Sequence, residues 1–358
     1  MNIIISAGGT MGHINPALAI IDEFKKREKN LNVLYIGTHN RMEKDIVPKK
    51  NIKYEEIEIY GLSKDIKRDI KNIFCIRKSY HKCLKIMRDF KPDVVIGVGG
   101  YVTYPVLKAA HKLHIKTFIH EQNSIPGKSN MFISKYADLV LLTFDSSKKY
   151  FKNNKRVITS GNPCASNAVA SLRIKKESLG FNKDLPLLVI VAGSLGSTSL
   201  NNKFKEFFKQ EKIENYQVCF ITGKSYYDEF IQDCKQVENV KVFPFMDNLP
   251  GLLKDSQAVI SRAGAGSLTE IMAIHVPSII VPSPYVANNH QYYNALELKE
   301  KNCVLLLEEK DVNNDSLKKM INLVLFDKKK REELESNMNL LKTSDSANII
   351  YKEIKKIL

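Results

Sequence analysis

Short apolar runs recur along the whole chain and alternate with longer stretches that have helical spacing. In the first half, the runs that predict strands lie at 3–6, 33–37, 94–98, 117–120, 139–143 and 156–159. In the second half they lie at 187–192, 217–222, 240–243, 258–261, 278–282 and 303–306. Several are continuous Val, Ile and Leu runs, which are typical of strands covered on both faces. The alternation predicts an α/β fold with two doubly wound parallel sheets.

This pattern is interrupted near the middle of the chain. Gly161, Asn162 and Pro163 follow the last strand of the first half, and Gly and Asn-Pro are strong breakers of regular structure. We therefore expect an N-terminal domain over 1–161 and a second domain over 162–343. Two more helices are predicted after residue 328, the second beginning with capping residues near Ser344. That last helix carries one broad apolar face, formed by Ile349, Ile350, Ile354 and Ile357.

Composition places the chain among ordinary globular proteins. Of its 358 residues, 44% are apolar and 26% are charged, which argues against a disordered chain. No apolar run approaches the roughly 20 residues that a membrane-spanning helix needs. The apolar start at 3–7 is too short for a secretory signal, so we expect a cytosolic protein. The six cysteines include no C-x-x-C pair, which favours reduced thiols over a zinc or thioredoxin-type site.

The net charge of +16 is concentrated in one half of the chain. Residues 1–161 hold 29 basic and 15 acidic residues, whereas residues 162–358 hold 26 basic and 24 acidic residues. Such an asymmetry suggests that the first half faces an anionic partner. Nucleic acid, a membrane surface and a phosphorylated substrate all qualify. A generally lysine-rich composition does not easily explain why only one half is unbalanced.

Four glycine-rich segments, each following a predicted strand, are candidates for binding phosphate and sugar; they span 8–20, 97–105, 193–201 and 261–270. Glycine lets the backbone approach an anion closely, and amides at a helix N-terminus point at it. Any one of them alone is explained equally well by a tight turn. The spacings around Gly127-Lys128 and Gly223-Lys224 do not fit a P-loop. The second strand also lacks the terminal acid that holds a NAD ribose.

The sequence contains no Asp-x-Asp motif, the pattern of a metal-dependent sugar-nucleotide enzyme. The charge of a leaving diphosphate would then be met by helix amides and helix dipoles. We therefore expect a design that needs neither a metal nor another cofactor.

Six motifs occur in order and together resemble the MurG family, the bacterial glycosyltransferases that complete lipid II: GGTMGHINPALAI (8–20), GVGGYVTYP (97–105), HEQNSIPGKSN (120–130), GSLGSTSLN (193–201), SRAGAGSLTE (261–270) and NNHQYYNA (288–295). The resemblance implies a GT-B fold, in which two Rossmann-like domains face each other across a deep cleft and a final helix (about 344–358) packs back on the first domain. It implies inverting transfer of N-acetylglucosamine from UDP-GlcNAc to the C4 hydroxyl of undecaprenyl-diphosphoryl-MurNAc-pentapeptide (lipid I), without a cofactor. It also implies a peripheral protein on the cytoplasmic face of the membrane.

In the first domain the resemblance implies roles in catalysis and in binding both substrates. His13 is the expected general base and an acceptor contact, while Glu121 remains an alternative base. His13 could instead only order its loop or bind acceptor phosphate. Tyr101 and Asn130 are expected on the acceptor side, and Asn130 also supports its loop. The donor contacts expected here are Thr10, Met11, Gly12 and Asn123.

In the second domain the resemblance implies a UDP-GlcNAc site built from Ser194, Met246, Ala265, Gly266, Ser267, Glu270, Gln291 and Asn294. Glu270 is expected to take the ribose hydroxyls, although a capping acid in a first helical turn remains an alternative. Gln291 and Asn294 are expected to grip sugar hydroxyls, with a plain polar helix N-terminus as the alternative. One departure from the family is Ala165, where many members carry an arginine that reaches the nucleotide.

The segment 64–91 is the strongest candidate for a membrane-facing surface. It holds ten basic and three acidic residues, interleaved with more apolar positions than one buried stripe needs. We expect an apolar patch rimmed by basic side chains, which an anionic bilayer attracts. The alternative is a plain surface helix with a solvated basic face. The residues expected in the patch are Ile70, Lys71, Phe74, Lys78 and Tyr80.

Three other functions compete with this interpretation. A GT-B transferase with a different lipid acceptor would lack the 97–105 and 120–130 motifs. UDP-GlcNAc 2-epimerases share the architecture but have no need of a basic apolar face. A nucleic-acid binder would need aromatic stacking platforms and would leave the glycine turns unexplained, so we expect no nucleic-acid partner. The sequence identifies no protein partner in wall synthesis.

Overall fold

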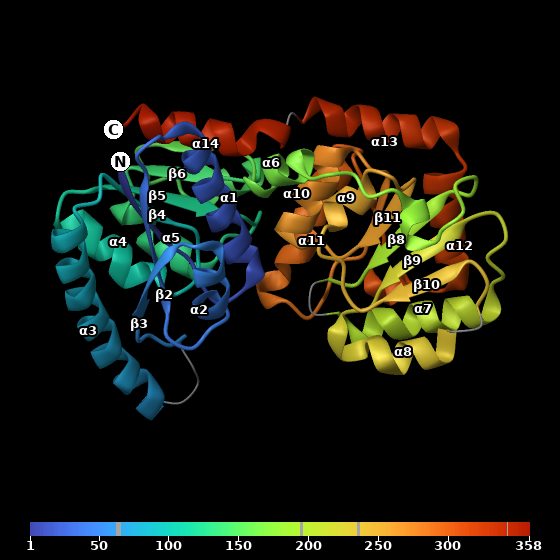
Figure 1. Cartoon of the computed structure of the whole chain (residues 1–358), viewed down its shortest axis with the longest axis horizontal. Coiled ribbons are helices and arrows are strands. Elements are labelled where there is room, and N and C mark those ends of the chain that lie inside the picture. Colours follow the sequence, from blue (N-terminus) through green and yellow to red (C-terminus); the bar gives the residue numbers. More distant parts are fainter. Residues whose placement is uncertain (62–65, 194–195, 235–236, 342) are drawn as a thin grey trace. The chain divides into compact units, whose positions relative to one another are not determined.

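The computed structural model describes residues 1–61, 66–193, 196–234, 237–341 and 343–358. The chain forms two compact units, which comprise Met1–Cys164 with Asp345–Leu358 (unit 1) and Ala165–Ser344 (unit 2). Each unit is built on one all-parallel sheet with helices between its strands, so the predicted α/β class is confirmed (Figure 1). Within the described part of the chain, no helix is both long enough and apolar enough to cross a membrane.

Unit 1 contains a seven-stranded sheet in the order β3-β2-β1-β4-β5-β6-β7. Its strands are β1 (Asn2–Ser6), β2 (Asn32–Thr38), β3 (Lys53–Ile57), β4 (Val94–Gly97), β5 (Lys116–Glu121), β6 (Leu139–Leu142) and β7 (Val157–Thr159). Its helices are α1 (Met11–Arg27), α2 (Glu43–Ile46), α3 (Ile66–Phe90), α4 (Thr103–Lys112), α5 (Lys128–Ile133) and α14 (Ser346–Lys355), and α6 (Cys164–Ala170) begins at the end of this unit.

Unit 2 contains a six-stranded sheet in the order β10-β9-β8-β11-β12-β13. Its strands are β8 (Leu187–Val191), β9 (Gln217–Ile221), β10 (Val240–Phe243), β11 (Ala258–Ser261), β12 (Ser278–Ile280) and β13 (Leu305–Leu306). Its helices are α7 (Thr198–Gln210), α8 (Tyr227–Cys234), α9 (Leu249–Leu253), α10 (Ala265–Ile274), α11 (His290–Glu300), α12 (Asn314–Leu325) and α13 (Lys328–Leu340).

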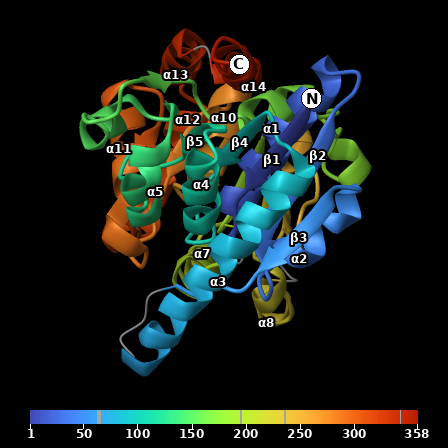
Figure 2. The same ribbon diagram turned by 90° about the vertical axis from the view of Figure 1, so that its left-hand side faces the viewer.

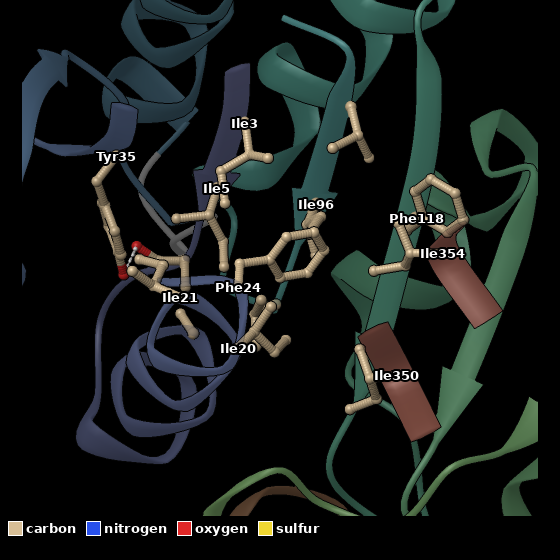
Figure 3. Close-up of a cluster of buried hydrophobic side chains, with 14 of the residues drawn as sticks. Ile3, Ile5, Ile20, Ile21, Phe24, Tyr35, Ile96, Phe118, Ile350 and Ile354 are labelled. Atoms are coloured by element: carbon tan, nitrogen blue, oxygen red, sulfur yellow. Dashed lines mark hydrogen bonds between the residues drawn. The ribbon is translucent and has the colours of Figure 1, made fainter. Parts of the chain in front are cut away.

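Successive apolar side chains along the strands of unit 1 point to opposite faces of the sheet, which divides its core in two. Ile3 and Ile5 of β1 pack on one face with α1 and with Ile350 and Ile354 of α14 (Figure 3). Ile4, between them, faces the opposite side, where α3 and α4 cover the sheet. Both faces are therefore closed, as expected for a parallel sheet.

The C-terminal helix α14 is an integral part of the unit 1 core. Its Tyr351 ring lies 5.0 Å from the ring of Phe24 on α1, and the Tyr351 hydroxyl donates to Glu28 at 2.8 Å. The Lys355 ammonium donates to the same carboxylate at 3.0 Å. The last ten residues of regular structure thus stabilise the first helix of the chain.

The strand order places the glycine turns at the same point of both sheets. In unit 1 the order reverses between β1 and β4, and these strands lead into the turns at 8–13 and 97–103. In unit 2 it reverses between β8 and β11, which lead into 193–197 and 261–267. Ligands of open α/β sheets bind at such switch points, beyond the carboxyl ends of the strands.

Candidate active site

A buried carboxylate outside the sequence motifs contacts the first glycine turn of unit 1. Glu43 of α2 accepts from the Gly9 amide at 3.1 Å and from the Thr38 hydroxyl at 2.6 Å. A Cβ on Gly8 would lie 2.5 Å from this carboxylate, so only glycine fits against it. Glu43 therefore fixes the loop that leads into α1.

His13 lies where the two glycine turns of unit 1 meet. Its Nδ1–H donates to the carbonyl of Gly8 at 2.9 Å, because a carbonyl can only accept. The lone pair of the neutral ring is therefore on Nε2. Gly99 has a φ of +107°, and a Cβ there would come within 2.9 Å of Nε2, so the second turn must be glycine to fit beside the imidazole.

Glu121 ends β5 and is fully enclosed by its own loop. With an exposed fraction of 1%, its carboxylate accepts from the backbone amides of Asn123 (2.9 Å) and Gly127 (3.2 Å) and from the Asn130 amide group (2.8 Å). Burial raises the pKa of Glu121, although these donors oppose the shift. These contacts make Glu121 the residue that holds the 121–130 loop together.

The other unit 1 candidates differ in exposure. Thr10 and Gly12 are exposed and Met11 is half-buried, and α1 begins without a side-chain cap, so these positions can receive an anion. Asn123 is half-buried, whereas Asn130 is buried and supports its loop by donating to Glu121.

Tyr101 is half-buried at the same edge of the sheet, beside a cation that the motifs did not indicate. Its hydroxyl accepts from the exposed Arg41 guanidinium at 3.4 Å. The two side chains thus form a polar rim next to the 97–103 turn.

In unit 2 the helices α7 and α10 start at the switch point. α10 follows Gly264 with no side-chain cap, and its first residues are the predicted Ala265, Gly266 and Ser267. A Cβ on Gly266 would meet nothing within 4 Å, so the backbone of this turn is open to a ligand. The predicted diphosphate contact Ser194 lies outside the described residues.

Glu270 is in the second turn of α10, not in its first. It therefore does not cap the helix, and that alternative is wrong. The residue as a whole is half-buried, and its carboxyl group forms no hydrogen bond or ion pair with any residue that the structure describes. Burial raises its pKa to about 7. An unpartnered carboxylate beside the open turn suits the vicinal hydroxyls of a ribose.

This raised pKa predicts a pH dependence of ribose binding. An ionised carboxylate can accept hydrogen bonds from both ribose hydroxyls. The Glu270 carboxyl loses its charge as the pH falls through about 7. Uridine has a ribose but no phosphate, and we expect it to bind about 10-fold more weakly at pH 6 than at pH 8. Calorimetric titration at both pH values measures this, with Glu270→Gln as the control that should bind weakly at each. An unchanged pH dependence in Glu270→Gln would assign the titration to another group.

The remaining unit 2 candidates differ in their burial and contacts. Gln291 accepts from the Ser283 amide at 2.9 Å through Oε1, so this contact uses the oxygen and not the nitrogen of its side-chain amide. Asn294 is fully buried and donates to the Ala263 carbonyl at 3.3 Å, so it ties α11 to the 261–270 turn. Met246 is half-buried after Phe245. Ala165 is fully buried in α6, and its methyl side chain supplies no hydrogen-bond donor.

The basic helix α3 projects with its N-terminal end beyond the rest of unit 1 (Figure 2). Near this end Phe74 is 70% and Ile73 is 64% exposed, and Lys71 and Lys78 are exposed beside them. Tyr80 of α3 is not exposed: it is half-buried against the core of unit 1, and the centre of its ring lies 5.3 Å from the Lys108 ammonium. Ile73 therefore takes the exposed place expected for Tyr80, and the side chain of Ile70 lies outside what the structure describes.

Comparisons with known proteins match both units. The model of the "Glycosyltransferase family 28 N-terminal domain" matches residues 3–142, and that of the "Glycosyltransferase family 28 C-terminal domain" matches residues 187–350. A relative from Halalkalibacterium halodurans is 38% identical and one from Bacillus cytotoxicus is 39% identical. These alignments cover 100% of this chain and 99% and 100% of the two relatives. Both relatives carry the name UDP-N-acetylglucosamine–N-acetylmuramyl-(pentapeptide) pyrophosphoryl-undecaprenol N-acetylglucosamine transferase.

Solved structures share the fold. MurG of Acinetobacter baumannii superposes with a TM-score of 0.77 at 24% identity, over 99% of both chains. The UDP-GlcNAc 2-epimerase of Neisseria meningitidis superposes with a TM-score of 0.66 at 15% identity, over 99% of this chain and 100% of the epimerase. Fold alone therefore does not separate a transferase from an epimerase.

Proposed function

Because the chain belongs to glycosyltransferase family 28, and within it to the MurG family, we propose that it converts lipid I into lipid II. The reaction transfers N-acetylglucosamine from UDP-GlcNAc to the C4 hydroxyl of MurNAc-pentapeptide-diphosphoryl-undecaprenol, with inversion at the anomeric carbon. The observation that carries the proposal is identity of 38–39% over the full length of transferases with this name. The glycine turns at both switch points supply the matching chemistry.

In this mechanism His13 acts as the general base. The acceptor C4 hydroxyl gives its proton to Nε2 of His13 while its oxygen attacks the anomeric carbon. The bond from that carbon to the diphosphate oxygen breaks, and the electron pair leaves with UDP. The Gly8 carbonyl holds Nδ1–H and stabilises the imidazolium that forms.

The donor is held by the carboxyl edge of the unit 2 sheet. The first amides of α7 and α10 bind the diphosphate, and each helix dipole contributes about 0.3–1 kcal/mol. Glu270 accepts from the ribose hydroxyls, Met246 borders the base, and Gln291 contacts the sugar. In unit 1, Asn123 and the first residues of α1 are the donor contacts that we propose.

The acceptor requires the enzyme to approach a bilayer, because lipid I is anchored by its undecaprenyl chain. The exposed Ile73 and Phe74 with their neighbouring lysines (the α3 face, residues 71–78) suit an anionic membrane surface. We propose a peripheral protein that acts on the cytoplasmic leaflet with this face.

A UDP-release assay tests the proposal. With UDP-GlcNAc and a short-chain lipid I analogue, UDP should be released, and without acceptor it should not. Addition of EDTA should leave the rate largely intact. Conversion of UDP-GlcNAc to its 2-epimer without acceptor would favour the epimerase alternative, and activity abolished by EDTA and restored by Mg²⁺ would contradict the metal-independent mechanism.

A further inference from the structure

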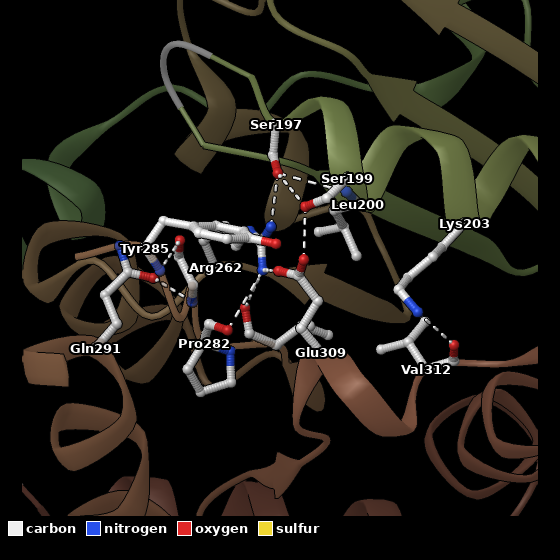
Figure 4. Close-up of polar contacts among 12 residues, drawn as sticks. Ser197, Ser199, Leu200, Lys203, Arg262, Pro282, Tyr285, Gln291, Glu309 and Val312 are labelled. Carbon is white, nitrogen blue, oxygen red and sulfur yellow. Dashed lines mark hydrogen bonds and ion pairs between the residues drawn. The ribbon is translucent and has the colours of Figure 1, made fainter.

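A buried arginine connects three segments at the switch point of unit 2 (Figure 4). Arg262 directly follows β11 and is 5% exposed. One nitrogen of its guanidinium, Nη1, lies 2.5 Å from Glu309 Oε2 and donates to the carbonyls of Val281 and Pro282 at 3.2 and 3.3 Å. The other nitrogen, Nη2, donates to the hydroxyl of Ser197 at 2.6 Å. The forked cation therefore joins the end of β12, the 309–311 turn and the start of α7.

The carboxylate of Glu309 links Arg262 to a second serine of α7. Its Oε1 accepts from the Ser199 hydroxyl at 2.5 Å, while Oε2 pairs with Arg262. Glu309 is itself buried, so the pair is neutral and shielded from water. Both ends of the ion pair thus contact the first turn of α7, through Ser197 and Ser199.

These contacts determine where the Ser197 hydroxyl hydrogen can point. Ser197 is the N-cap of α7, and its oxygen accepts from the Leu200 amide at 3.4 Å as well as from Arg262. A hydroxyl has two acceptor positions and one donor hydrogen. With both acceptor positions in use, the hydroxyl hydrogen is left to donate. The Ser199 oxygen lies 3.4 Å away, and a phosphate oxygen at normal hydrogen-bond distance would replace this long contact.

We propose that Arg262, held by Glu309, is a positioning residue for the donor's diphosphate. It fixes Ser197 so that the hydroxyl hydrogen and the first amides of the 13-residue helix α7 converge on one phosphate. Because Glu309 balances its charge, Arg262 acts by geometry rather than by adding positive potential. This inference rests on the proposed function, in which α7 binds the diphosphate of UDP-GlcNAc.

The test compares UDP with uridine, which differ only in the diphosphate. Arg262→Lys keeps the charge but cannot span the same acceptors, so UDP should bind about 10-fold more weakly while uridine affinity stays within two-fold. Ser197→Ala should lower UDP affinity in the same selective way. The double variant Arg262→Lys with Ser197→Ala should lose no more than the larger single loss, because both changes remove one arrangement.

Two variants keep the result interpretable. Arg173→Lys changes the exposed Arg173–Asp255 pair of the same unit and should bind UDP like the wild type. If Arg262→Lys unfolds, as its melting curve would show, Glu309→Gln replaces it, because its amide keeps the size of the carboxyl and loses the ion pair.

The outcomes separate the two proposals. A wild-type protein that fails to bind UDP would overturn the proposed function itself. A wild-type protein that prefers UDP to uridine, with a folded Arg262→Lys or Glu309→Gln that keeps the same preference, would overturn the positioning role. Equal losses of UDP and uridine affinity would also overturn it, by assigning the ion pair to fold stability alone.

Discussion

Replacement of His13 by glutamine is expected to lower turnover by about 10²-fold or more, the usual contribution of a positioned general base. The glutamine side chain can still donate to the Gly8 carbonyl, which His13 Nδ1 contacts at 2.9 Å, so the loop should keep its shape. It cannot take a proton from the acceptor hydroxyl. UDP affinity should change little, because the proposed nucleotide contacts lie in unit 2. Steady-state kinetics with a lipid I analogue and titration with UDP measure the two effects.

Glu121→Gln is the matched control for the alternative base. A glutamine NH₂ group would face the amide donors of Asn123, Gly127 and Asn130, so this variant should lose about 1–3 kcal/mol of stability. Its turnover per folded molecule should stay within about 10-fold of the wild type, because Glu121 is not the residue proposed to take the proton. Near-normal turnover in His13→Gln, together with a large loss in Glu121→Gln, would transfer the base to Glu121.

Substitution of the α3 face is expected to release the protein from anionic vesicles. The triple variant Phe74→Asp, Lys71→Glu, Lys78→Glu removes two attractive charges, at about 1 kcal/mol each, and an exposed aromatic ring. Binding to vesicles that contain phosphatidylglycerol should fall by about 10²-fold or more on these magnitudes. Co-sedimentation measures it, and wild-type binding should weaken as salt is added.

A triple variant in unit 2 controls for the change of net charge. Phe326 is 48% exposed and Lys328 and Lys329 are exposed, so Phe326→Asp, Lys328→Glu, Lys329→Glu makes the same change elsewhere. It should bind vesicles nearly as well as the wild type, and both triple variants should keep their UDP affinity. If both triple variants lost the same amount of vesicle binding, the net charge of the protein and not the α3 face would explain the attraction to anionic vesicles. Equal wild-type binding to neutral vesicles would exclude an anionic surface as its partner.

The sequence predicted the strands that lie inside the two sheets, because strands covered on both faces are continuous apolar runs. It missed β3, which reads Lys-Tyr-Glu-Glu-Ile and lies at the edge of its sheet. Only Ile57 of this strand is buried, so hydrophobicity gives almost no signal. In unit 2, β13 is also an edge strand and is shorter than its predicted run, with two residues paired to β12.

The motifs also located the residues at the switch points, because those residues lie in short glycine-rich segments. They did not indicate the buried side chains that hold the turns. Glu43 is 34 residues from the Gly9 amide that it accepts from, and Glu309 is 110 residues from Ser199. Contacts at such separations between a carboxylate and a distant loop leave no local pattern. Arg262 lies inside a recognised motif, but its role depends on Glu309.

Two residues with predicted substrate roles also hold their own unit together. Asn130 and Asn294 are buried, and each donates to a group of its own unit. A polar residue in a functional motif has the same appearance in the sequence whether it contacts a ligand or holds a loop. The burial of such a side chain depends on packing that the sequence pattern does not reveal.

Analysis of the reaction product tests the central claim most directly. Purified protein, UDP-GlcNAc and a short-chain lipid I analogue should give a product with one added N-acetylhexosamine, and NMR should show it in a β linkage to C4 of MurNAc. An acceptor that lacks the C4 hydroxyl should give none. An unmodified acceptor after complete consumption of UDP-GlcNAc, or a sugar joined by an α linkage or at another position, would contradict the account.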